Sequence, residues 1–95
     1  MCWFIYIARC RDNSLYIGIT NNLSRREALH NKGKGSKYLL TKIPIKIIYN
    51  EKYLNKSQAR KREIQLKKWT RDKKERLIKG LIKITNESYF RFNFS

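Results

Sequence analysis

Two tyrosines near the N-terminus are the first residues whose type and placement could support chemistry. Tyr6 and Tyr16 lie in segments 2–9 and 15–20, which both have the aromatic and β-branched composition of strands. Tyrosine is one of the side chains that enzymes use to exchange protons with a substrate. It is also an ordinary strand residue, so the pair alone leaves a purely structural role open.

The turn between these two segments decides whether the phenols can meet. Residues 11–13 read Arg-Asp-Asn, which is turn chemistry, since Asn tolerates the left-handed region of backbone conformation. A three-residue turn with Asn13 left-handed pairs Tyr6 with Gly18 and places both phenols on the same face of the hairpin. Gly18 would then leave space beside Tyr6. A two-residue turn would put the tyrosines on opposite faces, so a functional pair predicts the three-residue turn.

An arginine and a histidine form the second candidate pair. Arg26 and His30 stand four residues apart in a segment of helical character, so both would lie on one helix face. Arginine offers a planar fork that matches phosphate oxygens, and imidazole can donate, accept or transfer a proton near neutral pH. Two solvated surface residues would have the same spacing. The neighbouring Arg25, one position away, would point elsewhere.

A single carboxylate, Glu63, is the third candidate. Ala59 four positions before it and Leu66 three positions after it place Glu63 at the edge of the apolar stripe of a helix. It could be a plain ion-pair partner of Lys67 at i+4. Alternatively, it is held inward to bind a hard divalent cation, because Mg²⁺ commonly uses one or two carboxylates and completes its shell with water and substrate phosphate.

Two phenols, an arginine, a histidine and one carboxylate are the parts that metal-assisted phosphodiester hydrolysis needs. A metal polarises the phosphate and lowers the pKa of its bound water, a base takes the water proton, and a guanidinium offsets the charge that develops on phosphorus. No Ser/His/Asp or Cys/His arrangement competes with this set. Residues 33–37, Gly-Lys-Gly-Ser-Lys, lack the spacing of a P-loop, so they contact nucleic-acid backbone or merely turn the chain.

The composition points to a folded domain with a polyanionic partner. The chain has 95 residues, enough for one domain, and its 23 Lys and Arg against 7 Asp and Glu give a formal net charge of +16. Such charge repels itself in a compact chain, so we expect it to serve nucleic acid first and an anionic membrane surface second. No apolar run approaches the roughly 20 residues that span a bilayer. Cys2 and Cys10 are too few for a disulfide framework or a four-ligand zinc site, which favours a reducing, cytoplasmic setting.

Six elements in the order β-β-α-β-α-α must position these side chains, so the fold class is α+β with a small mixed or antiparallel sheet. Strands are predicted at 2–9, 15–20 and 45–49, and helices are predicted to end at about residues 31, 69 and 80. Three polar residues predict the helix starts, since Asn21 or Asn22, Asn55 and Thr70 can each cap a first turn. Gln58 completes a capping box with Asn55, and a short helical turn is expected within 36–42.

Residues 1–82 are predicted to form one domain, and 83–95 a C-terminal tail that either docks as an extra strand or is disordered. The core needs the apolar residues of the helix that ends at about residue 69, which are Ile64, Leu66 and Trp69. The apolar positions of the last helix are Leu77, Ile78, Leu81 and Ile82. A membrane-surface helix would have to expose such residues, so this assignment argues against one.

The ordered set of motifs resembles the GIY-YIG nuclease superfamily, in particular its small stand-alone, UPF0213-like branch. Phe4-Ile5-Tyr6 stands where that family has its first triplet, and Tyr16-Ile17-Gly18 matches the second triplet fully. The stretch 18–38 is similar to the small members, and 59–69 resembles their metal-binding helix. Phe4 replaces the first motif glycine, and bulky residues at this position are similar to those of the small branch.

The resemblance implies a three-stranded antiparallel sheet flanked by helices and an endonuclease site with a single divalent metal, Mg²⁺ or Mn²⁺. Tyr6 and Tyr16 match the two motif tyrosines, one of which would act as the general base or assist it. Arg26 matches the arginine that stabilises the scissile phosphate. His30 matches a position close to the base or the leaving group, and Glu63 matches the carboxylate that holds the metal.

The expected partner is nucleic acid, most of all DNA, with branched or damaged DNA as candidate substrates and without a membrane or a small-molecule cofactor. The residues expected to contact it outside the reactive set are Arg25, Lys34, Lys37, Tyr38 and Lys67. The alternative is a non-catalytic nucleic-acid or ribosome-associated module that retains the fold. Convergence of the reactive set in one cleft would favour the nuclease, whereas an exposed Glu63 with Lys67 as its sole neighbour would favour the binding module.

Overall fold

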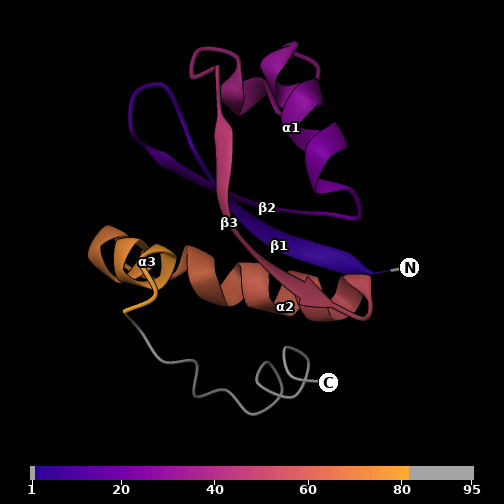
Figure 1. The fold of residues 1–95 in the computed structure, drawn as a ribbon, viewed down its shortest axis with the longest axis vertical. Coiled ribbons are helices and arrows are strands. Elements are labelled where there is room, and N and C mark those ends of the chain that lie inside the picture. The colour runs from indigo at the N-terminus through magenta and orange to yellow at the C-terminus, as the bar shows by residue number, and fades with distance from the viewer. Residues whose placement is uncertain (1, 82–95) are drawn as a thin grey trace.

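The computed structural model describes residues 2–81, which form three strands and three α-helices in the predicted order (Figure 1). The sheet is antiparallel, with β1 (Trp3–Arg9) in the centre between β2 (Leu15–Thr20) and β3 (Lys46–Tyr53). The α+β class and the three-stranded antiparallel sheet are therefore confirmed. The tail at 83–95, predicted either to dock or to be disordered, lies outside the described residues.

The β1–β2 hairpin has the three-residue turn that a shared face for the tyrosines requires. Asn13 is left-handed, with a φ of 71°. Tyr6 pairs with Gly18, and Tyr16 pairs with Ala8. Both phenols therefore project from the same face of the sheet, and the predicted register is confirmed.

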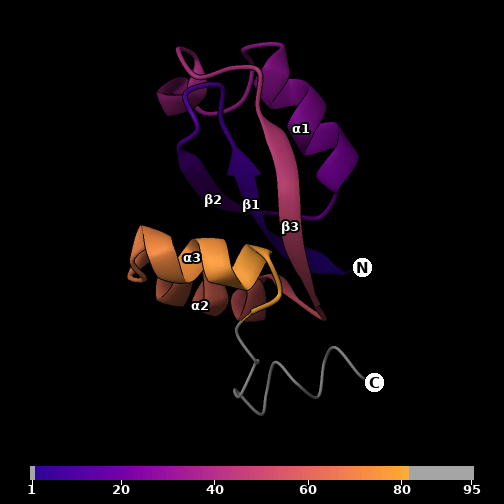
Figure 2. The same cartoon turned by 60° about the vertical axis from the view of Figure 1, so that its left-hand side comes forward.

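Helices cover both faces of the sheet, as two views of the molecule show (Figures 1 and 2). The helix α1 (Leu23–Asn31) and the short 3₁₀ helix η1 (Lys37–Leu39) lie on one face. The helices α2 (Lys56–Lys67) and α3 (Arg71–Ile78) lie on the other. Within residues 2–81, no helix is both long enough and apolar enough to cross a membrane.

Two apolar cores follow from this layering, because successive residues of β1 point to opposite faces. Under α2 and α3 lie the buried side chains of the first core: Ile5, Ile7, Ile17, Tyr53, Ala59, Leu66 and Leu77. Under α1 and η1 lie those of the second core: Tyr6, Ala8, Cys10, Leu39 and Ile45. Tyr6 thus belongs to a core as well as to the candidate site, so packing fixes its position.

Side-chain caps confirm all three predicted helix starts. Asn22, Asn55 and Thr70 each accept a hydrogen bond from the backbone amide three positions later, at 3.0, 3.0 and 3.2 Å. The reciprocal half of the predicted capping box is missing, because the buried side-chain oxygen of Gln58 has no hydrogen-bond partner. The helical turn expected within 36–42 is η1.

The strand β3 is longer than the predicted segment 45–49. It continues to Tyr53 and includes Glu51, whose carboxylate is buried in an ion pair with Arg62 of α2 at 2.9 Å. A carboxylate interrupts the apolar pattern from which a strand is inferred. The extension was missed because its polar side chain is satisfied by a partner eleven residues later in the sequence.

One residue assigned to the core is exposed instead. Ile64 faces solvent, whereas Leu66 is buried as predicted. Among the apolar positions of the last helix, Leu77 is buried and Leu81 is exposed. The buried positions of α2 include Arg62 in place of Ile64, because the helix turns its ion-paired arginine toward the sheet. Ile82 lies outside the described residues.

Candidate active site

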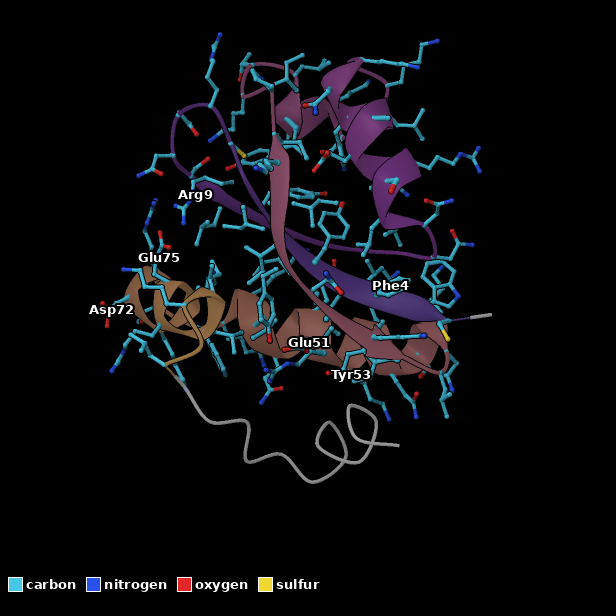
Figure 3. The ribbon with its side chains drawn as sticks, in the orientation of Figure 1. Phe4, Arg9, Glu51, Tyr53, Asp72 and Glu75 are labelled. Atoms are coloured by element: carbon cyan, nitrogen blue, oxygen red, sulfur yellow. The ribbon has the colours of Figure 1, made fainter. Side chains whose placement is uncertain are left out.

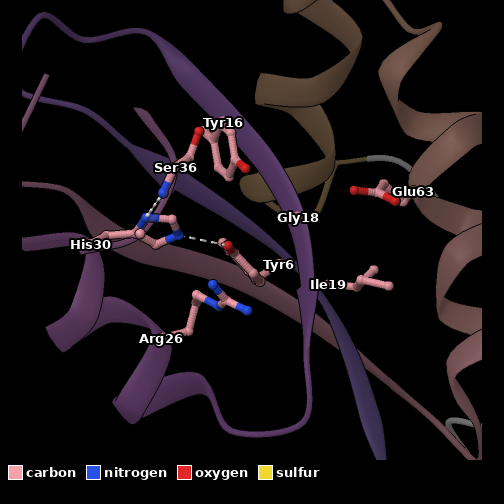
Figure 4. Close-up of a pocket in the computed structure, with 9 residues that line it drawn as sticks. Tyr6, Tyr16, Gly18, Ile19, Arg26, His30, Ser36 and Glu63 are labelled. Carbon is pink, nitrogen blue, oxygen red and sulfur yellow. Dashed lines mark hydrogen bonds between the residues drawn. The ribbon is translucent and has the colours of Figure 1, made fainter. Parts of the chain in front are cut away.

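One pocket of about 300 Å³ brings together all five predicted reactive residues. The residues that line it are Tyr6, Tyr16, Gly18, Ile19, Arg26, His30, Gly35, Ser36 and Glu63 (Figure 4). The tyrosines come from β1 and β2, the arginine and the histidine from α1, and the glutamate from α2. The convergence in one cleft that would favour the nuclease over the binding module is therefore observed.

Gly18, in the edge strand β2, is the position around which this pocket is built. A Cβ atom added there would lie 2.6 Å from the hydroxyl oxygen of Tyr6, so the phenol occupies the space that a side chain would need. The predicted reason for glycine at this position is confirmed. Glu63 lies across the β2 ribbon from Tyr6 (Figure 4), and the pocket therefore reaches around the edge of the sheet.

A chain of hydrogen bonds runs from Tyr6 through His30 to the loop after α1. The Tyr6 hydroxyl oxygen and His30 Nε2 are 3.1 Å apart, and the backbone N–H of Ser36 donates to His30 Nδ1 at 3.3 Å. Because Nδ1 accepts this bond, the neutral ring carries its proton on Nε2 and donates it to the phenol oxygen. The hydroxyl proton of Tyr6 is then directed away from the imidazole.

Burial holds both groups of this chain in their neutral forms. Burial is the main reason that the pKa of Tyr6 lies well above its ordinary value. The Tyr16 phenol raises this pKa further, the positive charge of Arg26 lowers it, and the negative charge of Glu63 raises it. Burial and then the positive charge of Arg26 lower the pKa of His30. At neutral pH the pair is therefore a phenol beside an uncharged imidazole.

Gly35 is a site residue that the sequence did not identify as one. A Cβ atom added there would lie 2.1 Å from His30 Nδ1, so this stretch of chain can pass over the imidazole only as glycine. The sequence indicates only that residues 33–37 turn the chain or contact nucleic-acid backbone. Gly33 turns the chain after α1, with a φ of 75°, whereas Gly35 gives the histidine its space. A second glycine two positions after the first was the available signal.

Arg26 is a half-buried cation that has no ion-pair partner among residues 2–81. It acts on the pKa of both Tyr6 and His30, so its charge lies close to both. A guanidinium that is partly removed from water without a carboxylate partner is suited to bind an anion. The adjacent Arg25 is exposed and does not line the pocket, as the helix geometry predicts.

Glu63 supplies the carboxylate among the residues that line the pocket. Its side chain is 13% exposed and lies between two exposed cations, with Arg60 Nε at 3.5 Å and Lys67 Nζ at 3.3 Å. It is therefore both ion-paired and turned inward. Within residues 2–81, no group of three or more His, Cys, Asp or Glu residues could hold a metal ion. One carboxylate fits a hard cation whose other ligands are water and phosphate.

The residues expected to contact nucleic acid are all exposed and lie outside the pocket lining. They are Arg25, Lys34, Lys37, Tyr38 and Lys67. Lys67 is already paired with Glu63. The ring of Tyr38 stacks on that of Tyr16, with centroids 6.2 Å apart, so it adjoins the pocket.

A buried polar network under α2 is a further feature that the sequence did not reveal. Arg62 Nε and Nη2 donate to the two carboxylate oxygens of Glu51 at 2.9 and 3.1 Å, and the hydroxyls of Tyr49 and Tyr53 donate to the same carboxylate. Glu51 and Tyr53 lie on β3 beside α2 (Figure 3). The network fixes α2 to the sheet at Arg62, one residue before Glu63. The alternation of Tyr49, Glu51 and Tyr53 was the feature of the sequence that could have indicated this network.

Comparisons with known proteins agree with this geometry. The model of the GIY-YIG catalytic domain matches residues 2–76. A UPF0213 protein of Staphylococcus aureus (strain Mu3) is 46% identical over 76 residues, which cover 80% of this chain and 93% of that protein. A UPF0213 protein of Staphylococcus haemolyticus is 44% identical over 75 residues, covering 79% and 92%. The solution NMR structure of a UPF0213 protein from Bacillus halodurans matches with a TM-score of 0.54 and 34% identity, covering 83% of this chain and 84% of its own.

Proposed function

We propose that this chain is an endonuclease that hydrolyses phosphodiester bonds of DNA with one divalent metal, Mg²⁺ or Mn²⁺. The starting point is that the chain belongs to the GIY-YIG family of catalytic domains. Branched and damaged DNA are the candidate substrates. The observation that carries the proposal is the half-buried Arg26, without an ion-pair partner among residues 2–81, in one pocket with two phenols and the carboxylate of Glu63. Cys2 and Cys10 are free thiols, which supports a reducing, cytoplasmic setting.

Arg26 binds the scissile phosphate in this proposal. Its guanidinium offers several N–H donors in one plane, so it can hold two phosphate oxygens and offset the charge that develops on phosphorus. Partial burial strengthens this interaction relative to a surface arginine. Arg26 is therefore the residue whose loss we expect to affect the chemical step most directly.

Tyr16 is the phenol that assists removal of the water proton. Tyr6 is the less available base, because burial raises its pKa and so keeps it protonated at neutral pH, and because His30 Nε2–H already occupies a lone pair of its oxygen. Its hydroxyl serves better as a donor to a phosphate oxygen. Tyr16 is half-buried in the same pocket, with its ring centroid 6.3 Å from that of Tyr6 and 5.7 Å from that of His30.

Glu63 is the residue that would hold the metal, which when bound supplies a polarised phosphate oxygen and a water of lowered pKa. The carboxylate must first loosen its ion pairs with Arg60 and Lys67. Phosphates of the substrate can take over both cations, because Arg60 and Lys67 are exposed and reach the surface beside the pocket. The geometry thus favours joint binding of metal and nucleic acid.

Cleavage assays with matched variants test the proposal. Purified protein is incubated with plasmid, branched DNA and RNA, with Mg²⁺, with Mn²⁺ and with chelator. We expect metal-dependent nicking of DNA that Glu63→Gln abolishes and that Arg26→Ala lowers by about 10²- to 10³-fold, as for loss of one transition-state donor, while binding and folding persist. Arg76→Ala is the control, because Arg76 is an exposed arginine of α3 that pairs with Asp72 and does not line the pocket, so this variant should keep most of the activity. Equal cleavage by Glu63→Gln protein, or none by wild type on any substrate, would refute the mechanism.

A non-catalytic nucleic-acid or ribosome-associated module is the second candidate. The two ion pairs of Glu63 favour it, since a carboxylate held by Arg60 and Lys67 is satisfied without a metal. Under this alternative the same assays give nucleic-acid binding that does not change with metal or with Glu63→Gln, and no nicking.

A further inference from the structure

We propose that Tyr38 is a stacking platform for an unpaired nucleobase, so that the substrate is a strand with an unstacked nucleotide beside the phosphate held at Arg26. The inference rests on the proposed function for the location of that phosphate. It adds the substrate class: single strands, gaps, flaps or bulges, in preference to uninterrupted duplex.

The first observation is that Tyr38 is an aromatic ring held in water by an anchored turn. It is 60% exposed and is the one aromatic among the exposed large apolar side chains of residues 2–81. The Ser36 hydroxyl accepts a hydrogen bond from the Tyr38 backbone amide at 3.2 Å, and the next residue, Leu39, is buried in the core. A ring fixed in this way loses little conformational freedom when a base stacks on it.

The second observation is that the Tyr38 ring has two neighbours and still keeps most of its surface in water. Tyr16 stacks on Tyr38 with an angle of 26° between the planes, and the Lys42 ammonium lies 4.8 Å from the Tyr38 centroid. Lys42 Nζ also hydrogen-bonds the Ser14 hydroxyl at 3.3 Å. Both neighbours together leave the Tyr38 side chain 60% exposed. The ring surface that they leave uncovered is available to a base.

The third observation is that the platform adjoins the pocket and its cations. Tyr16 and Ser36 line the pocket and contact Tyr38 at the same time. Lys34 and Lys37 are exposed beside it and have no ion pair among residues 2–81. A positive surface with an exposed aromatic ring is the arrangement that binds single-stranded nucleic acid without sequence preference.

An uninterrupted duplex cannot use such a platform. Its bases stack on one another, and a base can stack on Tyr38 only after it leaves that stack. Leaving the stack costs a few kcal/mol in paired DNA and least where the base is already unpaired. The platform therefore selects substrates that contain an unpaired nucleotide. An apolar peptide is a poorer occupant, because the surrounding charges are those of Lys34 and Lys37 and the chain carries +16.

Binding measured in chelator tests the platform without cleavage. Fluorescence anisotropy compares four DNAs of one sequence at one salt concentration: a single strand, a blunt duplex, a duplex with a three-nucleotide gap, and the single strand with an abasic site. Wild type should bind the single strand and the gap more tightly than the other two. Tyr38→Leu should lower affinity for the single strand about 10-fold, in the range of one lost base–aromatic stack, and Tyr38→Phe should keep it.

Two further measurements make the result specific. The emission of 2-aminopurine, placed as the unpaired base, should fall on binding to wild type and Tyr38→Phe but not to Tyr38→Leu. Leu54→Ala is the control, because Leu54 is exposed but does not line or adjoin the pocket, and its thermal unfolding is compared with that of each Tyr38 variant. A ribose strand that binds as well as DNA supports the platform equally, since stacking does not read the sugar.

The outcomes separate this inference from the proposed function. The platform is overturned if Tyr38→Leu binds the single strand as tightly as wild type does, or if wild type binds the gapped and the blunt duplex equally. Either result has this consequence even if wild type cleaves DNA. Preference for the unpaired base without cleavage under any metal overturns the nuclease and leaves the platform standing. If wild type binds none of the four DNAs in chelator and cleaves none of them with metal, both proposals are wrong.

Discussion

At the scale of single residues, the pocket contains two charges and a set of neutral polar groups. Burial keeps Tyr6 and His30 uncharged, so the charged groups in the lining are Arg26 and Glu63. One is free of ion pairs within residues 2–81 and the other is held by two cations. An anionic ligand can therefore bind Arg26 at once, whereas a cation must compete for Glu63.

This competition predicts that Lys67 weakens metal binding in the absence of nucleic acid. Lys67→Met removes a positive charge 3.3 Å from the Glu63 carboxylate, and an exposed pair of this kind is worth about 0.2–1 kcal/mol. We expect the variant to bind Mn²⁺ a few-fold more tightly, measured by calorimetry. A non-cleavable oligonucleotide should raise the affinity of wild type for Mn²⁺ more than that of the variant.

The neighbouring Lys68 provides the control for this prediction. Lys68 is exposed and forms no ion pair among the described residues, so Lys68→Met changes the net charge by the same amount without freeing Glu63. Equal gains in Mn²⁺ affinity for both variants would mean that the ion pair has no specific effect and that only overall charge matters.

At the scale of elements, the network of Glu51 and Arg62 decides where α2 places the metal-binding candidate. Removing one partner leaves a buried charge, which typically costs about 3–5 kcal/mol, whereas replacing both by apolar residues is far less costly. We therefore expect Arg62→Met to destabilise the protein strongly and Glu51→Leu with Arg62→Met to recover part of the loss. Urea unfolding measures both. Additive losses in the double variant would contradict a coupled pair.

The elements also show which features of the fold could be predicted from the sequence and which could not. The hairpin register was predictable, because local turn chemistry at Asn13 and a two-residue side-chain period settle it. The caps were predictable for the same reason, since each depends on residues three apart. The buried position of Arg62 and the extension of β3 were not, because each depends on the other across the fold. Gly35 was missed as a site residue for a similar reason: the ring that needs its space belongs to α1.

At the scale of the whole molecule, the charge of +16 predicts that affinity for nucleic acid falls steeply with salt. Each phosphate that the protein neutralises releases counterions and contributes about −0.7 to −0.9 to the slope of log K against log salt. Lys34 and Lys37 flank the proposed platform, so we expect Lys34→Gln with Lys37→Gln to reduce the slope for a single strand by about 1.4, which is two contacts at about 0.7 each.

The sheet provides the control for this measurement, because its two edges face different surroundings. Lys46 begins β3, at the opposite edge of the sheet from the β2 edge that borders the pocket, and it is exposed. If nucleic acid docks at the pocket, Lys46→Gln leaves the slope nearly unchanged, and the lysine pair next to Tyr38 accounts for the loss. A reduction by Lys46→Gln as large as that of either single lysine would mean that the charge binds diffusely. The nucleic-acid strand would then follow no preferred path into the pocket.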